Sequence, residues 1–292
     1  MIKQTVLELA KRYAYPEPFI ETNLRLNSLV TVDDVQSVID CYKSPQTLDF
    51  KGMTKIVEKL SDKYGVHRYT FNMFALVCLI PSLEGFYVEL GVPEEIFYDT
   101  LNDIKYKYDA CNQVYGVVGV SAWTWYELIL KLNVFQFGRL QFEYNTFFSY
   151  DSYEKGGNKL IKGQEVLSVH IPQSGKPLDY ESCKDSYRKA KEFFKKHFND
   201  KPIPFICWSW LVNPNNKLFM KENSNILTFA SDYDIIDVVE YKDYNAIAPW
   251  LFGKSRVDDL SPSDNDTSLQ KRAKEYLKNG GKLACAYGVF FA

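Results

Sequence analysis

Apolar side chains recur at spacings of three and four along the first part of the chain, which is the period of an α-helix. This pattern predicts helices over residues 2–13, 31–43, 53–65 and 69–80. The last of these is apolar on almost every side, as expected in the middle of a bundle, and Pro81 is expected to end it. Pro93 and the acidic pair after it favour a further helix that continues to Tyr108.

Residues 1–134 are therefore predicted to form an all-helical N-terminal domain, with a connector helix from about residue 119. The apolar pattern changes to a period of two at Phe135, which predicts one strand over residues 135–148. A polar segment with consecutive glycines leads from it to a second apolar run, residues 166–171. These two runs are expected to pair as an antiparallel hairpin with a long loop.

The second run opens a strand, loop and helix unit around which the rest of this region is expected to pack. Pro172 ends the strand, and residues 173–177 are of types that favour turns. Asp179 is predicted to cap a helix. The apolar face of that helix consists of Cys183, Tyr187, Ala190 and Phe194.

Further strands are predicted over residues 204–212, 235–241 and 283–291. A charged helix over 268–278 follows a loop, residues 253–268, whose Ser, Pro and Asp content predicts a mobile segment. The fold class is α+β, with the helical domain followed by a mixed α/β sheet domain over residues 135–292.

Charge and composition exclude several classes of function. The net charge of −2 provides no basic surface for nucleic acid and no electrostatic attraction to a membrane. No stretch approaches the roughly 20 apolar residues of a membrane span, and the N-terminus lacks the apolar core of a signal peptide, so a cytoplasmic protein is expected. The six cysteines include no C-x-x-C pair, so we expect neither a metal site nor a disulfide scaffold.

Four segments carry a resemblance to a known family. They are FGRLQFE at 137–143, VLSVHIPQSGKPL at 166–178, CWSWL at 207–211 and SNI at 224–226. These segments resemble the GNAT-like C-terminal domain of the acyl-CoA N-acyltransferase superfamily, which in bacterial proteins follows a helical N-acyltransferase N-terminal domain. The resemblance covers essentially the whole chain and implies a GNAT-like sheet for its second part.

In GNAT enzymes the acyl-CoA lies against the central strand, and backbone amides of the following loop hold its pyrophosphate, as helix N-termini hold anions. The resemblance implies acyl-CoA or acetyl-CoA as co-substrate and a small-molecule amine as acceptor. The cofactor-binding residues that it implies are Ile171, Gln173, Ser174 and Gly175. The usual Arg/Gln-x-x-Gly-x-Gly/Ala loop is absent here, and Pro177 removes one backbone amide.

His170 is the leading candidate for a catalytic base, because it lies in the central strand and imidazole exchanges protons near neutral pH. The alternative is a buried imidazole that only completes a hydrogen bond. Glu143 has three possible roles: a second base, the partner that orients His170, or half of an ion pair with Arg139.

A polar row is also predicted, provided that the three strands concerned are neighbours. It would combine Arg139, Gln141 and Glu143 with Ser168 and His170 and with Cys207 and Ser209. Such a row either lines a cavity or forms a buried network, since an unpaired buried polar group costs about 1 to 3 kcal/mol. The expected substrate-binding residues are Arg139, Gln141, Ser168, Ser209, Trp210 and Asn225. Asn225 is equally explained as a helix cap.

Two functions from different classes fit these observations. The first is a transferase that moves an acyl group from CoA, or from another thioester carrier, to an amine. The second is a ligand-binding or regulatory protein that retains the fold without the chemistry. The missing phosphate loop favours the second and the polar row favours the first, and the fold alone does not decide between them.

Overall fold

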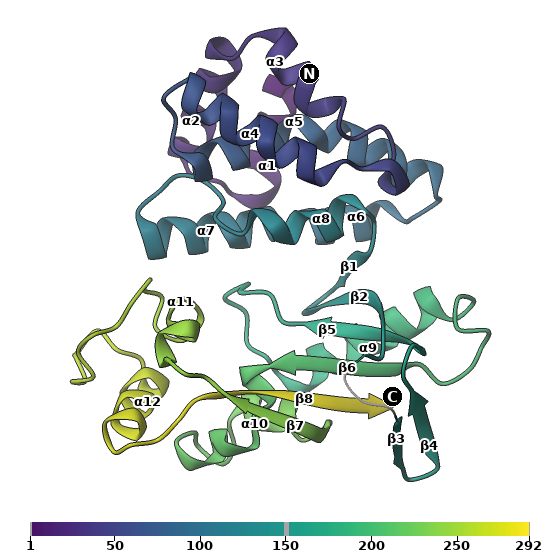
Figure 1. Ribbon diagram of the computed structural model, residues 1–292, viewed down its shortest axis with the longest axis vertical. Coiled ribbons are helices and arrows are strands. Elements are labelled where there is room, and N and C mark those ends of the chain that lie inside the picture. The colour runs from purple at the N-terminus through teal and green to yellow at the C-terminus, as the bar shows by residue number, and fades with distance from the viewer. Residues whose placement is uncertain (1, 149–151, 292) are drawn as a thin grey trace. The chain divides into compact units, whose positions relative to one another are not determined.

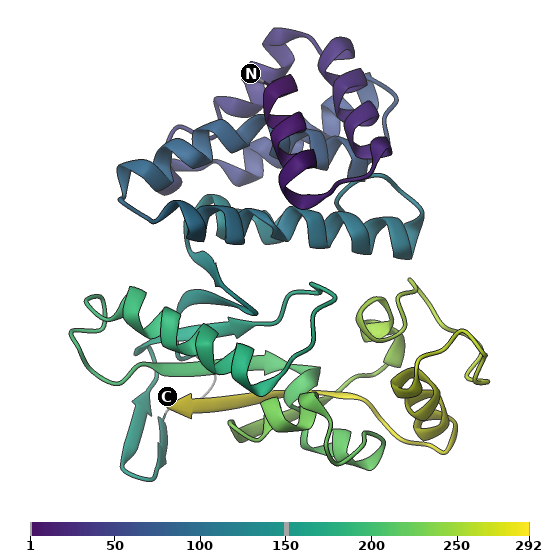
Figure 2. The same cartoon turned by 180° about the vertical axis from the view of Figure 1, so that it is seen from behind.

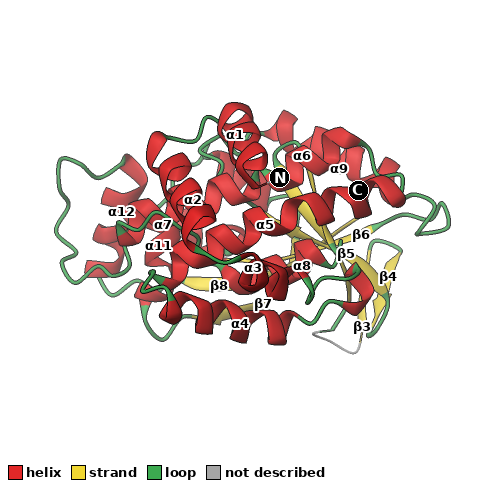
Figure 3. Cartoon of the chain, turned by 90° about the horizontal axis from the view of Figure 1, so that it is seen from above, coloured by secondary structure: helices red, strands yellow, loops and turns green. Residues whose placement is uncertain are grey.

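A computed structural model describes residues 2–148 and 152–291 and divides the chain into two compact units, Met1–Phe135 and Gln136–Ala292 (Figure 1). Helices make up the first unit, and the second combines a mixed sheet with helices (Figure 3). The predicted fold class is confirmed.

The helices of the first unit follow one another with short connections. They are α1 (Ile2–Tyr13), α2 (Glu17–Leu29), α3 (Val32–Ile39), α4 (Phe50–Lys63), α5 (Arg68–Glu89), α6 (Glu94–Leu101), α7 (Asp103–Tyr115) and α8 (Tyr126–Leu130), with 3₁₀ turns at Pro45–Thr47 and Trp123–Trp125. The pattern did not predict α2, because Asn23 occupies a fully buried position of its apolar stripe. The Asn23 side chain is accommodated there by donating to the Phe19 carbonyl at 2.8 Å.

Pro81 lies inside α5, so the prediction that it ends this helix is wrong. Side chains on all sides of α5 are buried, and this packing offsets the hydrogen bond that a helical proline removes. The expectation that no stretch reaches membrane-spanning length also needs correction, since α5 is long and apolar enough by those two criteria. Its most apolar window is 67% buried inside the protein, as expected for the central helix of a bundle.

The second unit contains the strands β1 (Val134–Phe137), β2 (Leu140–Thr146), β3 (Ser152–Lys155), β4 (Asn158–Ile161), β5 (Glu165–His170), β6 (Pro204–Ser209), β7 (Asp234–Glu240) and β8 (Ala284–Phe291). In the described part of the chain, six of them form one sheet in the order β1-β2-β5-β6-β8-β7. β5 and β6 are parallel, whereas β2·β5, β6·β8 and β7·β8 are antiparallel. The predicted hairpin between the first two long runs is thus confirmed as β2·β5.

The single strand predicted over residues 135–148 is two strands, because the chain turns at Gly138. The φ angle of Gly138 is 62°, a conformation that glycine adopts at low cost. Arg139, next in the chain, donates its backbone N–H to the Ser186 hydroxyl at 2.9 Å. Between β2 and β5 the chain forms a further hairpin, β3·β4, that the pattern did not predict.

The helices of this unit are α9 (Tyr180–Phe194), α10 (Asn225–Ala230), α11 (Ala248–Leu251) and α12 (Ser268–Lys278), with 3₁₀ turns at Trp210–Val212, Pro214–Leu218 and Tyr244–Ile247. α9 lies across one face of the sheet (Figure 2). Its buried side is the predicted one, and Tyr187 packs edge-on against Phe142 and Phe205. The opposite face carries a second cluster around Val166, Ile206 and Tyr287.

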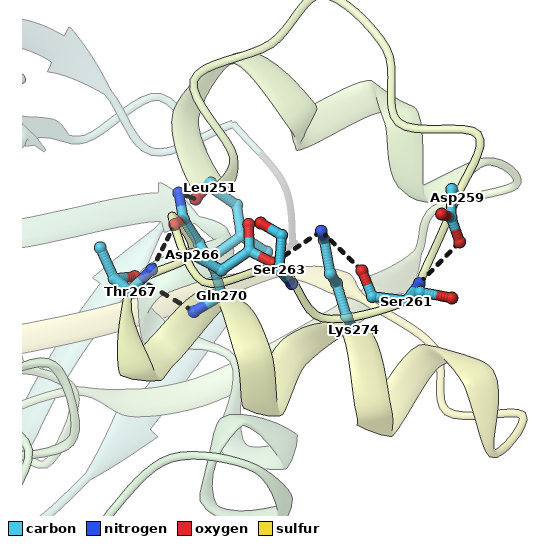
Figure 4. Close-up of polar contacts among 8 residues, drawn as sticks. All are labelled: Leu251, Asp259, Ser261, Ser263, Asp266, Thr267, Gln270 and Lys274. Atoms are coloured by element: carbon cyan, nitrogen blue, oxygen red, sulfur yellow. Dashed lines mark hydrogen bonds and ion pairs between the residues drawn. The ribbon is translucent and has the colours of Figure 1, made fainter.

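The loop over residues 253–268, predicted to be mobile, has fixed anchor points (Figure 4). Lys274 of α12 is only 5% exposed and donates to the Asp266 carboxylate at 2.8 Å and to the Ser261 carbonyl at 3.1 Å. Thr267 and Gln270 form a capping box at the start of α12, and the Gln270 amide also reaches the Leu251 carbonyl at 3.0 Å. These contacts tie the middle and the C-terminal end of the loop to α12, and they join α12 to α11, which precedes the loop.

Candidate functional site

The candidate site is built on the antiparallel strands β2 and β5. In their register Gln141 lies opposite His170 and Glu143 lies opposite Ser168. Opposed residues of an antiparallel pair point to the same face, and every second residue of a strand does so too. The sheet therefore places these four side chains on one face, as the alternation predicted.

His170 and Glu143 form a hydrogen-bonded pair, with 2.8 Å between His170 Nε2 and Glu143 Oε2. The His170 side chain is 33% exposed and that of Glu143 only 13%. A carboxylate in this position orients the imidazole. The imidazole is thus partly accessible, while its carboxylate partner is shielded from solvent.

Asn145 is a member of this site that the sequence analysis missed. Its side-chain amide donates to Glu143 Oε1 at 3.2 Å, so that both carboxylate oxygens accept a hydrogen bond. Asn145 follows Glu143 by two residues in β2, and the period of two was the signal that would have placed it on the same face.

Arg139 lies in the turn between β1 and β2, not in the predicted row. Its guanidinium donates to the Pro172 carbonyl and to the Pro177 carbonyl, each at 3.0 Å. Arg139 therefore holds both ends of the loop after β5, while the Glu143 carboxylate bonds His170 and Asn145.

Gln141 and Ser168 are buried at 1% and 8% exposure. The Gln141 amide donates to the side chain of Gln136 in β1 at 3.3 Å, and Gln136 donates to the Gly138 carbonyl at 3.0 Å. Of the two alternatives for the polar row, a buried hydrogen-bond network describes this part better than a cavity lining does.

The prediction that Cys207 and Ser209 join this row is wrong. The parallel register places Ser168 beside Ile206, so Ile206 and Trp208 share the face of His170 while Cys207 and Ser209 point to the other face. Cys207 is fully buried, and burial raises the pKa of its thiol far above the usual range. The Ser209 hydroxyl accepts from the Leu211 amide at 3.2 Å as the cap of a 3₁₀ turn.

Trp210 and Asn225 lie elsewhere in the second unit. Trp210 is in that 3₁₀ turn and packs against the cluster around Phe219 and Leu251. Asn225 is exposed, and it is Ser224 that caps α10 by accepting from the Ile226 amide at 3.3 Å. The prediction that Asn225 is the cap is therefore wrong by one residue.

The paired register of β5 and β6 ends at the site. Their register joins Leu167 to Phe205 and Ser168 to Ile206, although β5 continues to His170 and β6 to Ser209. Beyond Ser168, backbone groups on the β6 side of β5 lie outside the ladder between these two strands, and such groups are strong hydrogen-bonding groups. His170 is the second residue beyond the end of this ladder.

The loop after β5 already uses some of the amides proposed for phosphate. The Ser174 amide donates to the Pro172 carbonyl at 2.8 Å, and the Lys176 amide donates to the Ser174 hydroxyl at 3.3 Å. The Asp179 carboxylate accepts from the backbone and hydroxyl of Ser182, and these hydrogen bonds lower its pKa. Gln173 and Gly175 are exposed, Ile171 is half-buried, and Gly175 has a φ of 71°.

The sheet order, with one parallel pair at its centre, is that of a GNAT-like domain, and this domain follows a helical unit in the chain. Comparisons with family models agree. The GNAT-like C-terminal domain model matches residues 134–290, more than half of the chain, and the N-acyltransferase N-terminal domain model matches residues 5–132. The chain belongs to this family of two-domain N-acyltransferase proteins.

Solved structures share the fold over nearly the whole chain. An acyltransferase in complex with decanoyl-CoA is 22% identical, with a TM-score of 0.72, and the match covers 98% of this chain and 86% of that one. An acyltransferase with decanoyl-CoA and teicoplanin has 18% identity, a TM-score of 0.73 and coverages of 98% and 87%. A mutant acyltransferase with octanoyl-CoA has 20% identity, a TM-score of 0.73 and coverages of 99% and 88%. No curated protein matches the chain.

Proposed function

We propose that this protein is an acyl-CoA-dependent N-acyltransferase that transfers an acyl group to the amine of a small molecule. The observation that carries the proposal is the His170–Glu143 pair on one face of β5, next to the point where the pairing of β5 with β6 ends. The acyl-CoA complexes of the similar structures support acyl-CoA as the donor.

The acyl-CoA would lie along the end of β5, where backbone groups of Val169 to Ile171 lie beyond the ladder with β6. The exposed residues Gln173 and Gly175 and the Lys176 ammonium, in a loop held by Arg139, would contact its phosphates. This assignment adds Lys176 to the cofactor-binding residues, because a lysine side chain supplies a positive charge that the backbone amide of Ser174 does not.

In the reaction the amine nitrogen attacks the thioester carbonyl carbon, the C–N bond forms and the C–S bond breaks. The His170–Glu143 pair accepts the proton that the amine loses, and the departing CoA sulfur takes up a proton to leave as the thiol. Glu143 stabilises the imidazolium that forms, because the carboxylate is 2.8 Å from Nε2.

A binding or regulatory protein is the second candidate, and one observation favours it. Asp179 caps α9 with a carboxylate, which competes with a phosphate for the first amides of that helix. A protein of this kind would bind CoA weakly or bind another ligand, and would release no CoA thiol in the presence of an amine.

Thermal unfolding with CoA, acetyl-CoA and octanoyl-CoA tests the donor. A ligand at 100 times its dissociation constant is expected to stabilise the folded protein by about 2.7 kcal/mol and to raise its melting temperature. An Arg139→Lys variant, which cannot hold both loop carbonyls, should need more ligand for the same shift. The absence of any shift with all three ligands would contradict the proposal and favour the binding protein.

A further inference from the structure

Aromatic side chains lie beside the His170–Glu143 pair on the same face of the sheet. Trp208 of β6 lies opposite Tyr287 of β8, and their ring centroids are 5.7 Å apart. The Phe148 ring also packs against Tyr287, with 5.8 Å between ring centroids. We call Trp208, Tyr287 and Phe148 the aromatic platform.

The platform is fixed at its centre and exposed at its ends. Tyr287 is fully buried in the cluster with Val166 and Ile206, whereas Trp208 is 48% exposed and Phe148 is 54% exposed. Single exposed apolar residues are ordinary on protein surfaces. Here position matters, because Ser168 and Ile206 are the last residues that pair β5 with β6. His170 follows Ser168 by two residues, and Trp208 follows Ile206 by two.

Trp208 and His170 therefore lie on the same face of the sheet, on neighbouring strands and at the same level. Neighbouring strands in a sheet lie about 4.8 Å apart, so one ligand with a flat ring and an amine can contact both side chains. The indole face attracts a cationic ammonium and the C–H faces of rings. Glu143 places a carboxylate on the same face.

We propose that Trp208 determines acceptor specificity, and that the acceptor is a ring-bearing primary amine that stacks on the Trp208 indole with its nitrogen directed at His170. The acylation of this amine rests on the proposed function, whereas the binding of its ring to Trp208 does not. The ring is either an aromatic ring or the sugar of an amino sugar, since both present a flat apolar face to indole.

The full-length protein is assayed with octanoyl-CoA as donor and with three amines as acceptors: tyramine, which has an aromatic ring, glucosamine, which is an amino sugar, and n-hexylamine, which has no ring. The release of CoA thiol gives kcat and KM for each amine, and comparing these values shows which kind of ring is preferred. In Trp208→Ala we expect kcat/KM for the preferred ring amine to fall about tenfold, mainly through KM, with little change for n-hexylamine. Trp208→Phe should restore most of the loss because it restores an aromatic face.

Trp250→Ala is the matched control, since Trp250 is 54% exposed, close to the 48% of Trp208, but lies on α11 and not on a strand of the sheet. It should leave all three amines unaffected. An equal loss with all three amines in Trp208→Ala would overturn the inference, and so would wild-type kinetics with no preference for a ring.

Saturation-transfer NMR of the same amines gives a readout that does not depend on turnover. Signal transfer to a ring amine in the wild type that disappears in Trp208→Ala supports the platform even if no amine is acylated, in which case only the proposed function fails. Turnover of n-hexylamine without binding or preference for either ring amine rejects the platform and leaves the transferase intact.

Discussion

Replacing His170 by Gln is expected to lower turnover by about 10²- to 10⁴-fold, with CoA affinity and melting temperature nearly unchanged. Gln retains a side chain of similar size that still donates to Glu143, 2.8 Å away in the wild type, but it accepts no proton. The test measures the single-turnover rate and the melting temperature of the same sample.

The structural alternative for His170 predicts a different result. If the imidazole only completes a hydrogen bond, His170→Gln costs about 1 to 3 kcal/mol of unfolding free energy, and lost activity follows the unfolded fraction. A normal rate per folded molecule would remove His170 from the mechanism and leave Glu143 as the next residue to test. His197→Gln is the control, because His197 also lies near a carboxylate, 3.9 Å from Glu165, but is 48% exposed.

Local sequence patterns predicted the elements of the site well. The start of α9 was predicted from Asp179, whose side chain accepts from the Ser182 amide. The face of the sheet to which Glu143 of β2 points was predicted from the period of two. Both depend on residues close together in the chain. The antiparallel partner of Glu143 was also predictable, because β2 and β5 are joined as a hairpin.

What the sequence did not predict depends on contacts between distant residues. The parallel register of β5 and β6 decides whether Cys207 or Trp208 faces His170, and a shift by one residue exchanges the two faces. Nothing local to β6 sets this register, because β6 follows β5 through α9 and pairs with β8 on its other side. Pro81 is similar, since the packing around α5 outweighs the local preference of proline.

Lys274 and Asp266 give the largest expected effect on stability. The side chains are 6% and 10% exposed, and Lys274 Nζ lies 2.8 Å from Asp266 Oδ2. Removing one partner of a buried ion pair leaves an uncompensated charge, so Asp266→Asn is expected to lower the unfolding free energy by about 3 kcal/mol at pH 7. Lys274→Met combined with Asp266→Asn should recover part of this loss, because no buried charge then remains.

The pH dependence of this loss has a defined sign. The hydrogen bond from Lys274 lowers the pKa of Asp266, so the ionised carboxylate stabilises the fold above its unfolded pKa of about 3.9, and this contribution is lost as pH falls through the folded pKa. The difference in unfolding free energy between wild type and Asp266→Asn, measured by urea unfolding, should therefore be largest at pH 7 and should decrease below about pH 4.

Asp258→Asn is the control. It removes a carboxylate of the same loop that is 75% exposed, and it should cause no such pH-dependent loss. Proteolysis within residues 253–268 should accelerate in Asp266→Asn alone, and equal cleavage of both variants would show that Lys274 does not anchor the loop.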